Sequence, residues 1–562
     1  MNTDLVRSTI QTGRKDCQMR YNWKPIFIVM INIIILMSGC SAQRYGLGYE
    51  LQEETVRREI EMSSEAVDPA KITVDEILTS SLFIKVAEQI FGKSAADITW
   101  SQLQQVSYLE ISLSKLNLQD VVITYMLNQG APTPKNIWSV KGRATQYEPN
   151  HSNQAPPDTY ADCQVIEIPA AVRTRGDNEI GDLGYFTGLN SLVLGAEIKL
   201  KSVQKDLGTL TQLRCLSISH ISFAEIRQLF PAGAPITDLI ISYADEGSIG
   251  EIEQFTQLKS LSMNRCKVSS LDGLESFQNL RLLELNECSV TDDMSALSRS
   301  KSLEALFVKG KNYSQIDYLS EIKDLKRLKS LHLNDSDIWS LSPLMENTSL
   351  TELSLHKCEN LRDITAIETM TNLKTFYIIM SGKMAKLDFN KIPQLTDLYI
   401  SVSGGVQFDD LAGLTNLELL TFFNFDTATD LQILTEFHSL RYLQISQVRY
   451  NDDLSPILNL PKLENIYLNN SQFLLNDGKL LPNENLIVLS LENAEINGSK
   501  AGEFSFLSNY PNLRYLSLAG INLSSLEFID NLPVLKEFHL QRDLELDYGM
   551  LDQQEDLQYF LR

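Results

Sequence analysis

The chain has 562 residues, of which 43% are hydrophobic and 22% are charged, and its formal net charge is −23. This composition predicts a folded globular protein, and the length favours a repeat architecture because a single hydrophobic core stops growing well below this size. Nucleic-acid backbones are bound by clustered lysine and arginine, so the acidic balance argues against a nucleic-acid partner.

Residues 1–39 have the composition of an export signal. Basic residues precede an apolar run from Pro25 to Met37, which is too short for a typical membrane-spanning helix. The run ends in Leu-Met-Ser-Gly-Cys at 36–40, which resembles the lipobox of bacterial lipoproteins, with Met37 where that motif usually has leucine. The resemblance implies a signal peptide over 1–39 and acylation of Cys40. An uncleaved anchor or a plain signal peptide is the alternative.

A lipid on Cys40 would hold the chain at the extracytoplasmic face of the cell membrane. Anionic headgroups repel an acidic protein, so we expect the acyl chains rather than a basic patch to provide attachment. Residues 40–75 combine glycine, serine and mixed charges. We expect this segment to form a tether between the membrane and the folded part.

The next segment is predicted to close the open end of the folded part. Residues 76–112 combine an apolar helix face within 83–93 with a strand near 106–111, which is the pattern of an N-terminal cap and first strand. A polar, proline-containing insertion is predicted over 113–162. The leucine-rich repeat domain is then expected over 163–562, beginning with an irregular strand at Val165 to Ile168.

An internal repeat dominates this last region. The pattern Leu-x-x-Leu-x-Leu recurs 16 times, mostly 22 or 23 residues apart, and its first positions are residues 189, 213, 236, 258, 280, 303, 328, 350, 373, 395, 417, 440, 463, 486, 513 and 535. A period of this length is the signature of leucine-rich repeats. We therefore predict an α/β repeat solenoid, curved, with a parallel β-sheet on its concave face and turns or short helices on its convex face.

The spacing also identifies the core. Positions 4 and 6 of each copy point to the same side of a short strand, and stacked neighbours bury that side. Apolar residues about eleven positions further on, such as Val268 and Leu271, are expected to fill the convex half of the core. These side chains are interpreted as packing residues without a functional role.

Over roughly residues 80–556, the repeats and the helix before them resemble the internalin-like class of bacterial leucine-rich repeat proteins. That class often has asparagine at position 9 of the repeat, where this chain has Cys266, Cys288 and Cys358 or serine. A small buried thiol can replace the amide in the turn after the strand. Cys266 and Cys288 lie at equivalent positions of adjacent repeats with parallel side chains, which favours free thiols, and a disulfide between them is the alternative.

Signatures of catalysis are missing from the sequence. It contains no Gly-x-Ser-x-Gly, no His-Glu-x-x-His and no phosphate-binding glycine loop, so we interpret the chain as a non-enzyme without cofactors. His332 and His356 fall at positions 5 and 7 of neighbouring copies and could approach one another. A metal site there is the weaker alternative because a third ligand is missing.

Positions 3, 5 and 7 remain for the concave surface. In the copies that begin at 373 to 463, they supply the predicted ligand-binding residues Tyr377, Ile379, Tyr399, Leu419, Phe423, Tyr442 and Tyr467. Aromatic side chains clustered on a rigid sheet are typical of binding hot spots, and the serine, asparagine and glutamine residues around them are common in paratopes. Alternatively, the rings only stack along the strands and stiffen the sheet.

These observations predict a lipid-anchored cell-surface protein that binds a protein partner through its concave face, as a receptor or adhesin. The alternative function is that of an envelope-organising or glycan-binding structural protein of the same cell. A substrate-capturing subunit of an extracellular enzyme system is a third possibility, disfavoured because no catalytic domain is attached.

Overall fold

The computed structural model divides the chain into two units, Met1–Val67 and Asp68–Arg562. It describes residues 68–113, 121–127, 164–168, 179–195, 207–291, 294–310, 318–345, 347–380, 387–402, 406, 408–423, 432–446, 449–497, 504–541, 546, 548–554 and 557–561. The predicted signal peptide, Cys40 and most of the predicted tether and insertion lie outside these residues. Every helix within them is too short or too polar to cross a lipid bilayer.

Short helices precede the first strand. They are α2 (Val74–Ile77), α3 (Ser81–Phe91), η1 (Ala95–Asp97) and α4 (Trp100–Leu103), so the helical segment begins two residues before the predicted boundary at 76. The Ser80 hydroxyl accepts a hydrogen bond from the backbone of Phe83 at the start of α3, and Gly92 ends the helix with φ +62°. The Phe83 ring packs against Phe186, with 5.6 Å between ring centroids. This contact fixes α3 against the beginning of the repeats.

The sheet begins with strands of mixed direction. Strand β1 (Val106–Leu113) lies where the first strand is expected and pairs in parallel with β4 (Ser191–Leu194). Its other edge pairs antiparallel with β2 (Val121–Leu127), which falls inside the predicted insertion. Strand β3 (Gln164–Ile168), expected as an irregular strand opening the repeat domain, pairs antiparallel with β2. Strand β2 therefore covers the edge of β1 that would otherwise be open to pairing, and β3 in turn covers β2.

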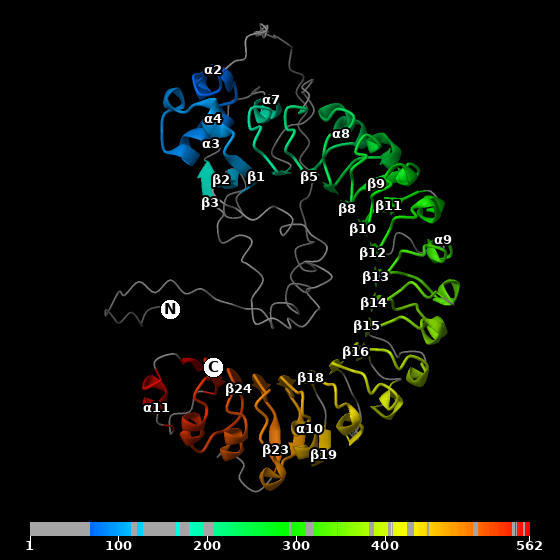
Figure 1. The fold of residues 1–562 in the computed structure, drawn as a ribbon, viewed down its shortest axis with the longest axis vertical. Coiled ribbons are helices and arrows are strands. Elements are labelled where there is room, and N and C mark those ends of the chain that lie inside the picture. The colour runs from blue at the N-terminus through cyan, green and yellow to red at the C-terminus, as the bar shows by residue number, and fades with distance from the viewer. Residues whose placement is uncertain are drawn as a thin grey trace, which may run out of the picture. The chain divides into compact units, whose positions relative to one another are not determined.

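From β4 onward, each repeat strand pairs in parallel with the next, and the array curves in Figure 1. The strands that follow β4 are β5 (Cys215–Ser219), β6 (Asp238–Ser242), β8 (Ser260–Asn264), β10 (Leu282–Asn286), β12 (Ala305–Lys309), β13 (Ser330–Asn334), β14 (Glu352–His356), β15 (Thr375–Met380), β16 (Asp397–Val402), β17 (Leu419–Phe423), β18 (Tyr442–Ile445), β20 (Asn465–Tyr467), β22 (Val488–Ser490), β24 (Tyr515–Leu518), β25 (Glu537–Leu540) and β26 (Gln558–Leu561). With β1 to β4 they form a sheet of twenty described strands. This arrangement confirms the predicted curved leucine-rich repeat solenoid, and β26 adds a strand beyond the sixteen copies.

Turns and short helices connect the strands on the other side of the core, as predicted. They are α7 (Glu179–Leu183), α8 (Phe223–Leu229), η5 (Ile249–Ile252), η6 (Leu274–Ser276), η7 (Ser295–Arg299), α9 (Tyr318–Ile322), η9 (Ser342–Leu344), η10 (Thr365–Thr369), η11 (Phe389–Lys391), η12 (Phe408–Leu411), η13 (Gln432–Glu436), α10 (Ser455–Leu458), η14 (Asp477–Lys479), η15 (Ser505–Asn509), η16 (Glu527–Asn531) and α11 (Gly549–Asp552). Two small parallel sheets accompany them, formed by β7 (Gly247–Ser248), β9 (Lys267–Ser270) and β11 (Ser289–Val290), and by β19 (Arg449–Asp453), β21 (Gln472–Leu474) and β23 (Glu495–Asn497).

The core uses the positions that the spacing indicated. Leu398 and Ile400, at positions 4 and 6 of one repeat, are fully buried, and so is Leu271 on the convex side. One apolar cluster runs through the described part of the chain from Val74 to Leu551. Burial of each such leucine contributes about 1.5–3 kcal/mol, so the stacked repeats stabilise one another.

Position 8 of the repeat holds a tight turn after the strand. Arg265, Glu287 and Lys357 adopt the left-handed conformation there, with φ of 53°, 51° and 54°. Residues other than glycine have a strained backbone at such φ values. A hydrogen bond to the next repeat offsets this strain, since the Arg265 N–H donates to the Asn286 carbonyl at 2.7 Å. Each turn is thereby tied to the next repeat.

The cysteines at position 9 follow directly after these turns. Cys266, Cys288 and Cys358 are buried free thiols, as is Cys215, while Cys163 lies outside the described residues. The Cys266 Sγ donates to the Ile241 carbonyl at 3.4 Å, and the Cys288 Sγ donates to the Met263 carbonyl at 3.3 Å. The thiols thus bond to the backbone of the preceding repeat, and the predicted free state is confirmed for the four described cysteines.

Candidate functional site

The concave face is formed by side chains that the core does not use. In β15, Phe376, Ile378 and Met380 are buried, whereas Tyr377 and Ile379 between them are half-buried and point to the opposite side of the strand. The other five predicted residues are also half-buried and lie in equivalent positions of β16, β17, β18 and β20. We call this set the aromatic patch; it consists of Tyr377, Ile379, Tyr399, Leu419, Phe423, Tyr442 and Tyr467.

Register brings three rings of the aromatic patch together. Tyr377 and Tyr399 are paired across β15 and β16, and their rings stack with 4.1 Å between centroids and 23° between planes. Phe423 lies one strand further, with its centroid 5.6 Å from that of Tyr399. Aromatic pairs of this geometry contribute about 0.5–1.5 kcal/mol beyond their buried area. The stacking expected by the structural alternative is therefore present in the aromatic patch.

A second pair of rings lies across β18 and β20. The Tyr442 and Tyr467 centroids are 5.5 Å apart, and the Tyr442 hydroxyl donates to Gln444 Oε1 at 2.8 Å. Burial raises the pKa of both phenols, and for Tyr442 the neighbouring tyrosines raise it further. Both side chains are therefore neutral hydrogen-bonding groups at physiological pH.

The aromatic patch is almost free of charge. Among the residues at positions 3, 5 and 7 of β15 to β18 and β20, Asp397 is the single ionisable carboxylate, and there is no lysine, arginine or histidine. Its carboxylate accepts a hydrogen bond from Thr396 at 2.6 Å and one from Thr375 at 3.4 Å. The aliphatic side chains of Ile379 and Leu419 fill the positions around the rings. The patch can therefore bind apolar and neutral polar groups with little desolvation of charge.

The strands before the aromatic patch carry a different surface, which we call the polar region. It consists of the residues at positions 5 and 7 of β8, β10, β12, β13 and β14, together with Glu352. Asn286 Nδ2 donates to Asn264 Oδ1 at 2.8 Å and to Glu284 Oε1 at 2.6 Å, and Ser262 donates to Glu284 at 2.8 Å. The polar groups of β8 and β10 therefore bond to each other across two neighbouring repeats.

The two histidines of the polar region do not share a ligand. His332 Nε2 lies 3.3 Å from Glu352 Oε1, and the His332 ring stacks on Phe307 at 4.1 Å. Burial would raise the pKa of Glu352, but hydrogen bonds from His332 and Ser330 lower it overall. Burial lowers the pKa of His356 to about 4. Within the described part of the chain, no three His, Cys, Asp or Glu side chains are grouped as metal ligands.

Several asparagine side chains form an asparagine ladder, which links repeats at the position directly before their first leucine. The repeat pattern did not identify this position. Where asparagine directly precedes the first leucine of a repeat, its side chain donates to a carbonyl of the preceding repeat. The bonds join Asn279 to Thr256 (3.4 Å), Asn372 to Thr348 (2.8 Å), Asn416 to Pro393 (2.9 Å), Asn485 to Pro461 (2.8 Å) and Asn512 to Glu484 (2.8 Å). The recurring Asn-Leu dipeptide is the sequence signal that could have revealed it. This ladder defines the edge of the solenoid where the strands start.

Comparison with known proteins gives likeness of structure alone. No protein-family model and no curated protein matches the chain. Among solved structures, an internalin (InlF) of Listeria monocytogenes is 17% identical, with coverage of 83% of this chain and 97% of that chain and a TM-score of 0.36. A leucine-rich repeat protein of Leptospira interrogans is 18% identical, with coverage of 67% and 91% and a TM-score of 0.44. The functional domain of InlJ of L. monocytogenes, which includes a cysteine ladder, is 16% identical, with coverage of 84% and 82% and a TM-score of 0.39.

Proposed function

We propose that this chain is a binding protein of the cell surface that holds a protein partner on the aromatic patch and catalyses no reaction. The observation that carries the proposal is the composition of the patch: seven apolar or aromatic side chains lie on a rigid sheet face that the core does not need. Large apolar side chains at the centre of an interface supply most of its binding free energy.

A protein partner fits the patch better than a glycan does. Aromatic binding of a sugar requires an open ring face, whereas one face of Tyr377 and one face of Tyr399 are occupied by each other at 4.1 Å. The aliphatic side chains of Ile379 and Leu419 lie on the same face of the sheet as the rings. Such a surface suits apolar side chains and backbone groups of a protein.

The experiment is capture of a partner by the unit from Asp68 to Arg562, with the Tyr399→Ala/Tyr467→Ala variant as the matched control. Extracellular proteins and isolated envelope glycans are offered separately, and bound material is identified by mass spectrometry and then measured by calorimetry with purified components. Saturable binding of one protein that the double variant lacks supports the proposal. Equal capture by both forms, or capture of glycan alone, contradicts it.

We further propose that the protein is held at the extracytoplasmic face of the membrane by a lipid on Cys40. The lipobox-like sequence at 36–40 supports this. Metabolic labelling with an alkyne fatty acid, followed by membrane fractionation, tests it: the natural chain should incorporate label, and Cys40→Ala should not. Cys163→Ala is the control for other thiols. Undiminished labelling of Cys40→Ala would contradict the assignment of the lipid to Cys40.

A further inference from the structure

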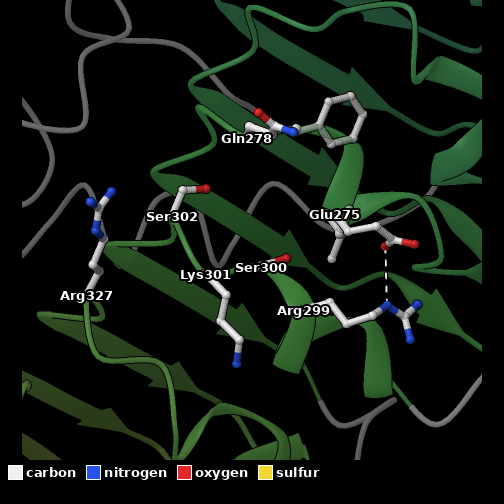
Figure 2. Close-up of a pocket in the computed structure, with 9 residues that line it drawn as sticks. Glu275, Gln278, Arg299, Ser300, Lys301, Ser302 and Arg327 are labelled. Atoms are coloured by element: carbon white, nitrogen blue, oxygen red, sulfur yellow. Dashed lines mark ion pairs between the residues drawn. The ribbon is translucent and has the colours of Figure 1, made fainter.

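A recess interrupts the edge of the solenoid where the strands start. It has a volume of about 370 Å³ and lies among the turns before β10, β12 and β13. Its lining residues are Leu274, Glu275, Phe277, Gln278, Arg299, Ser300, Lys301, Ser302 and Arg327. Figure 2 shows the side chains of Arg299, Lys301 and Arg327 around this recess. Three cations thus line one small cavity in a chain whose net charge is −23.

The recess lies beside repeats without the ladder asparagine. Asn279 and Asn372 donate to the preceding repeat, whereas the equivalent positions of the three repeats between them hold Ser302, Arg327 and Ser349. Ser349 donates to the Leu325 carbonyl at 3.2 Å, but Ser302 and Arg327 make no such bond within the described part of the chain. Arg327 is exposed. The Arg327 side chain therefore does not tie its repeat to the preceding one, as asparagine does at this position elsewhere.

The positive charge of the recess is only partly neutralised. Arg299 forms ion pairs with Glu275, at 3.4 Å, and with Asp272. Lys301 and Arg327 have no carboxylate within ion-pair distance among the described residues, and both are exposed. Glu275 is the single acidic residue in the lining. The lining therefore carries an excess of two positive charges, which attracts anions locally although the whole molecule repels them.

The wall of the recess also contains an unsatisfied hydroxyl group. Ser300 is 3% exposed, and its Oγ has no hydrogen-bond partner in the described part of the chain. A buried hydroxyl without a partner is destabilising. Ser300 directly precedes Lys301 in the chain and belongs to the lining of the recess.

We propose that this recess is a binding site for an oxyanion of the phosphate or sulfate class, carried on a small polar unit such as a sugar ester. Arginine binds such groups through two parallel N–H donors, and lysine adds a point charge. The volume lies at the lower end of the range for small-molecule pockets, which suits a sugar-sized ligand better than a protein loop. The site lies on the strand-start edge and is independent of the aromatic patch.

Calorimetry on the full-length protein in detergent tests the proposal, with inorganic phosphate, inorganic sulfate, glucose 6-phosphate and glucose as probes. We expect saturable binding of the three anions, weakened by added salt, and none of glucose. Lys301→Gln/Arg327→Gln should weaken anion binding by about tenfold or more, since it removes both unpaired cations. Lys259→Gln/Lys374→Gln removes the same charge from exposed positions on the same edge outside the recess, and should change affinity by less than about twofold.

The outcomes separate a built site from diffuse attraction. Tighter binding of glucose 6-phosphate than of phosphate identifies an ester as the ligand, and equal binding identifies the free anion. Equal weakening by the two double variants, or no saturable anion binding by the natural chain, overturns the proposal. Melting temperatures of both variants establish that they fold. Tyr399→Ala should leave anion binding unchanged, so failure of this site and failure of the aromatic patch are distinguishable.

Discussion

The aromatic patch and the polar region occupy the same face of the same sheet. Their strands belong to different copies of the same repeat pattern. In both, positions 4 and 6 are buried leucine, isoleucine, phenylalanine or similar side chains. At positions 3, 5 and 7, however, β15 to β18 and β20 present five aromatic rings and two aliphatic side chains, while β8, β10, β12, β13 and β14 present mostly polar and charged side chains. The repeat therefore fixes the core and leaves the concave face free to differ from strand to strand.

The two regions also differ in the hydrogen bonds that their side chains make. Glu284, Asn286 and Asn264 bond to one another, so an incoming partner would have to replace existing hydrogen bonds. In the aromatic patch, a partner gains apolar contact without breaking charged pairs. Buried polar networks of the first kind rigidify a surface, and apolar rings of the second kind drive association.

The largest expected effect separates the core from the concave face within one strand. Leu398→Ala should lower the free energy of unfolding by about 2–5 kcal/mol, because it leaves a cavity in a fully buried site. Tyr399→Ala, at the next residue, should cost only about 0.5–1.5 kcal/mol through lost stacking. Urea unfolding followed by circular dichroism measures both. Equal losses would show that Tyr399 is a structural residue and that the aromatic patch is wrongly assigned.

The next effect compares two matched ring stacks. Tyr377 stacks on Tyr399 and Phe307 stacks on His332, each with 4.1 Å between centroids, but only the first pair lies in the aromatic patch. Once the partner is identified, Tyr377→Ala should weaken binding by about 2 kcal/mol or more, and Phe307→Ala should not. Titration calorimetry on folded protein provides the measurement. If both substitutions weaken binding alike, the partner contacts the polar region as well.

A pH effect is expected in the polar region and not in the aromatic patch. The pKa of His356 is about 4 in the folded chain and about 6.5 when unfolded, so the unfolded state binds its proton first as the pH falls. The contribution of neutral His356 to stability is complete above pH 6.5 and is lost as the pH drops toward 4. Between pH 7 and pH 5, the free energy of unfolding should fall by about 1–2 kcal/mol more for the natural chain than for His356→Gln. Denaturant titrations at both values check this, and parallel losses would contradict the assignment to His356.

The smallest change is expected from reduction of the thiols next to the polar region. Cys266, Cys288 and Cys358 follow β8, β10 and β14 as buried free thiols, and burial raises the pKa of Cys358 to about 12. Ellman titration of the denatured chain should therefore give the same thiol count with and without prior reduction. In the native chain the Cys358 thiol should react slowly, because the thiolate is the reactive form. A higher count after reduction would reveal a disulfide.

The sequence by itself determined the architecture of this protein. A period of 22 or 23 residues with leucine at positions 1, 4 and 6 allows one solution, stacked parallel strands, because no single repeat can bury its own apolar side. The same spacing assigned Tyr377 and Tyr467 to one face of the sheet and the cysteines to the turns after the strands. Side-chain direction in a strand alternates with a fixed period of two, so these assignments need no tertiary information.

Only the tertiary structure decided what neighbouring repeats do to each other. Stacking of Tyr377 on Tyr399, the bond from Asn372 to Thr348 and the recess beside Arg327 depend on the lateral register between repeats of unequal length. The antiparallel pairing of β2 with β1 joins segments whose polar linker gave no periodic signal. Contacts between side chains more than twenty residues apart depend on how the repeats stack. The spacing within one repeat does not contain that information.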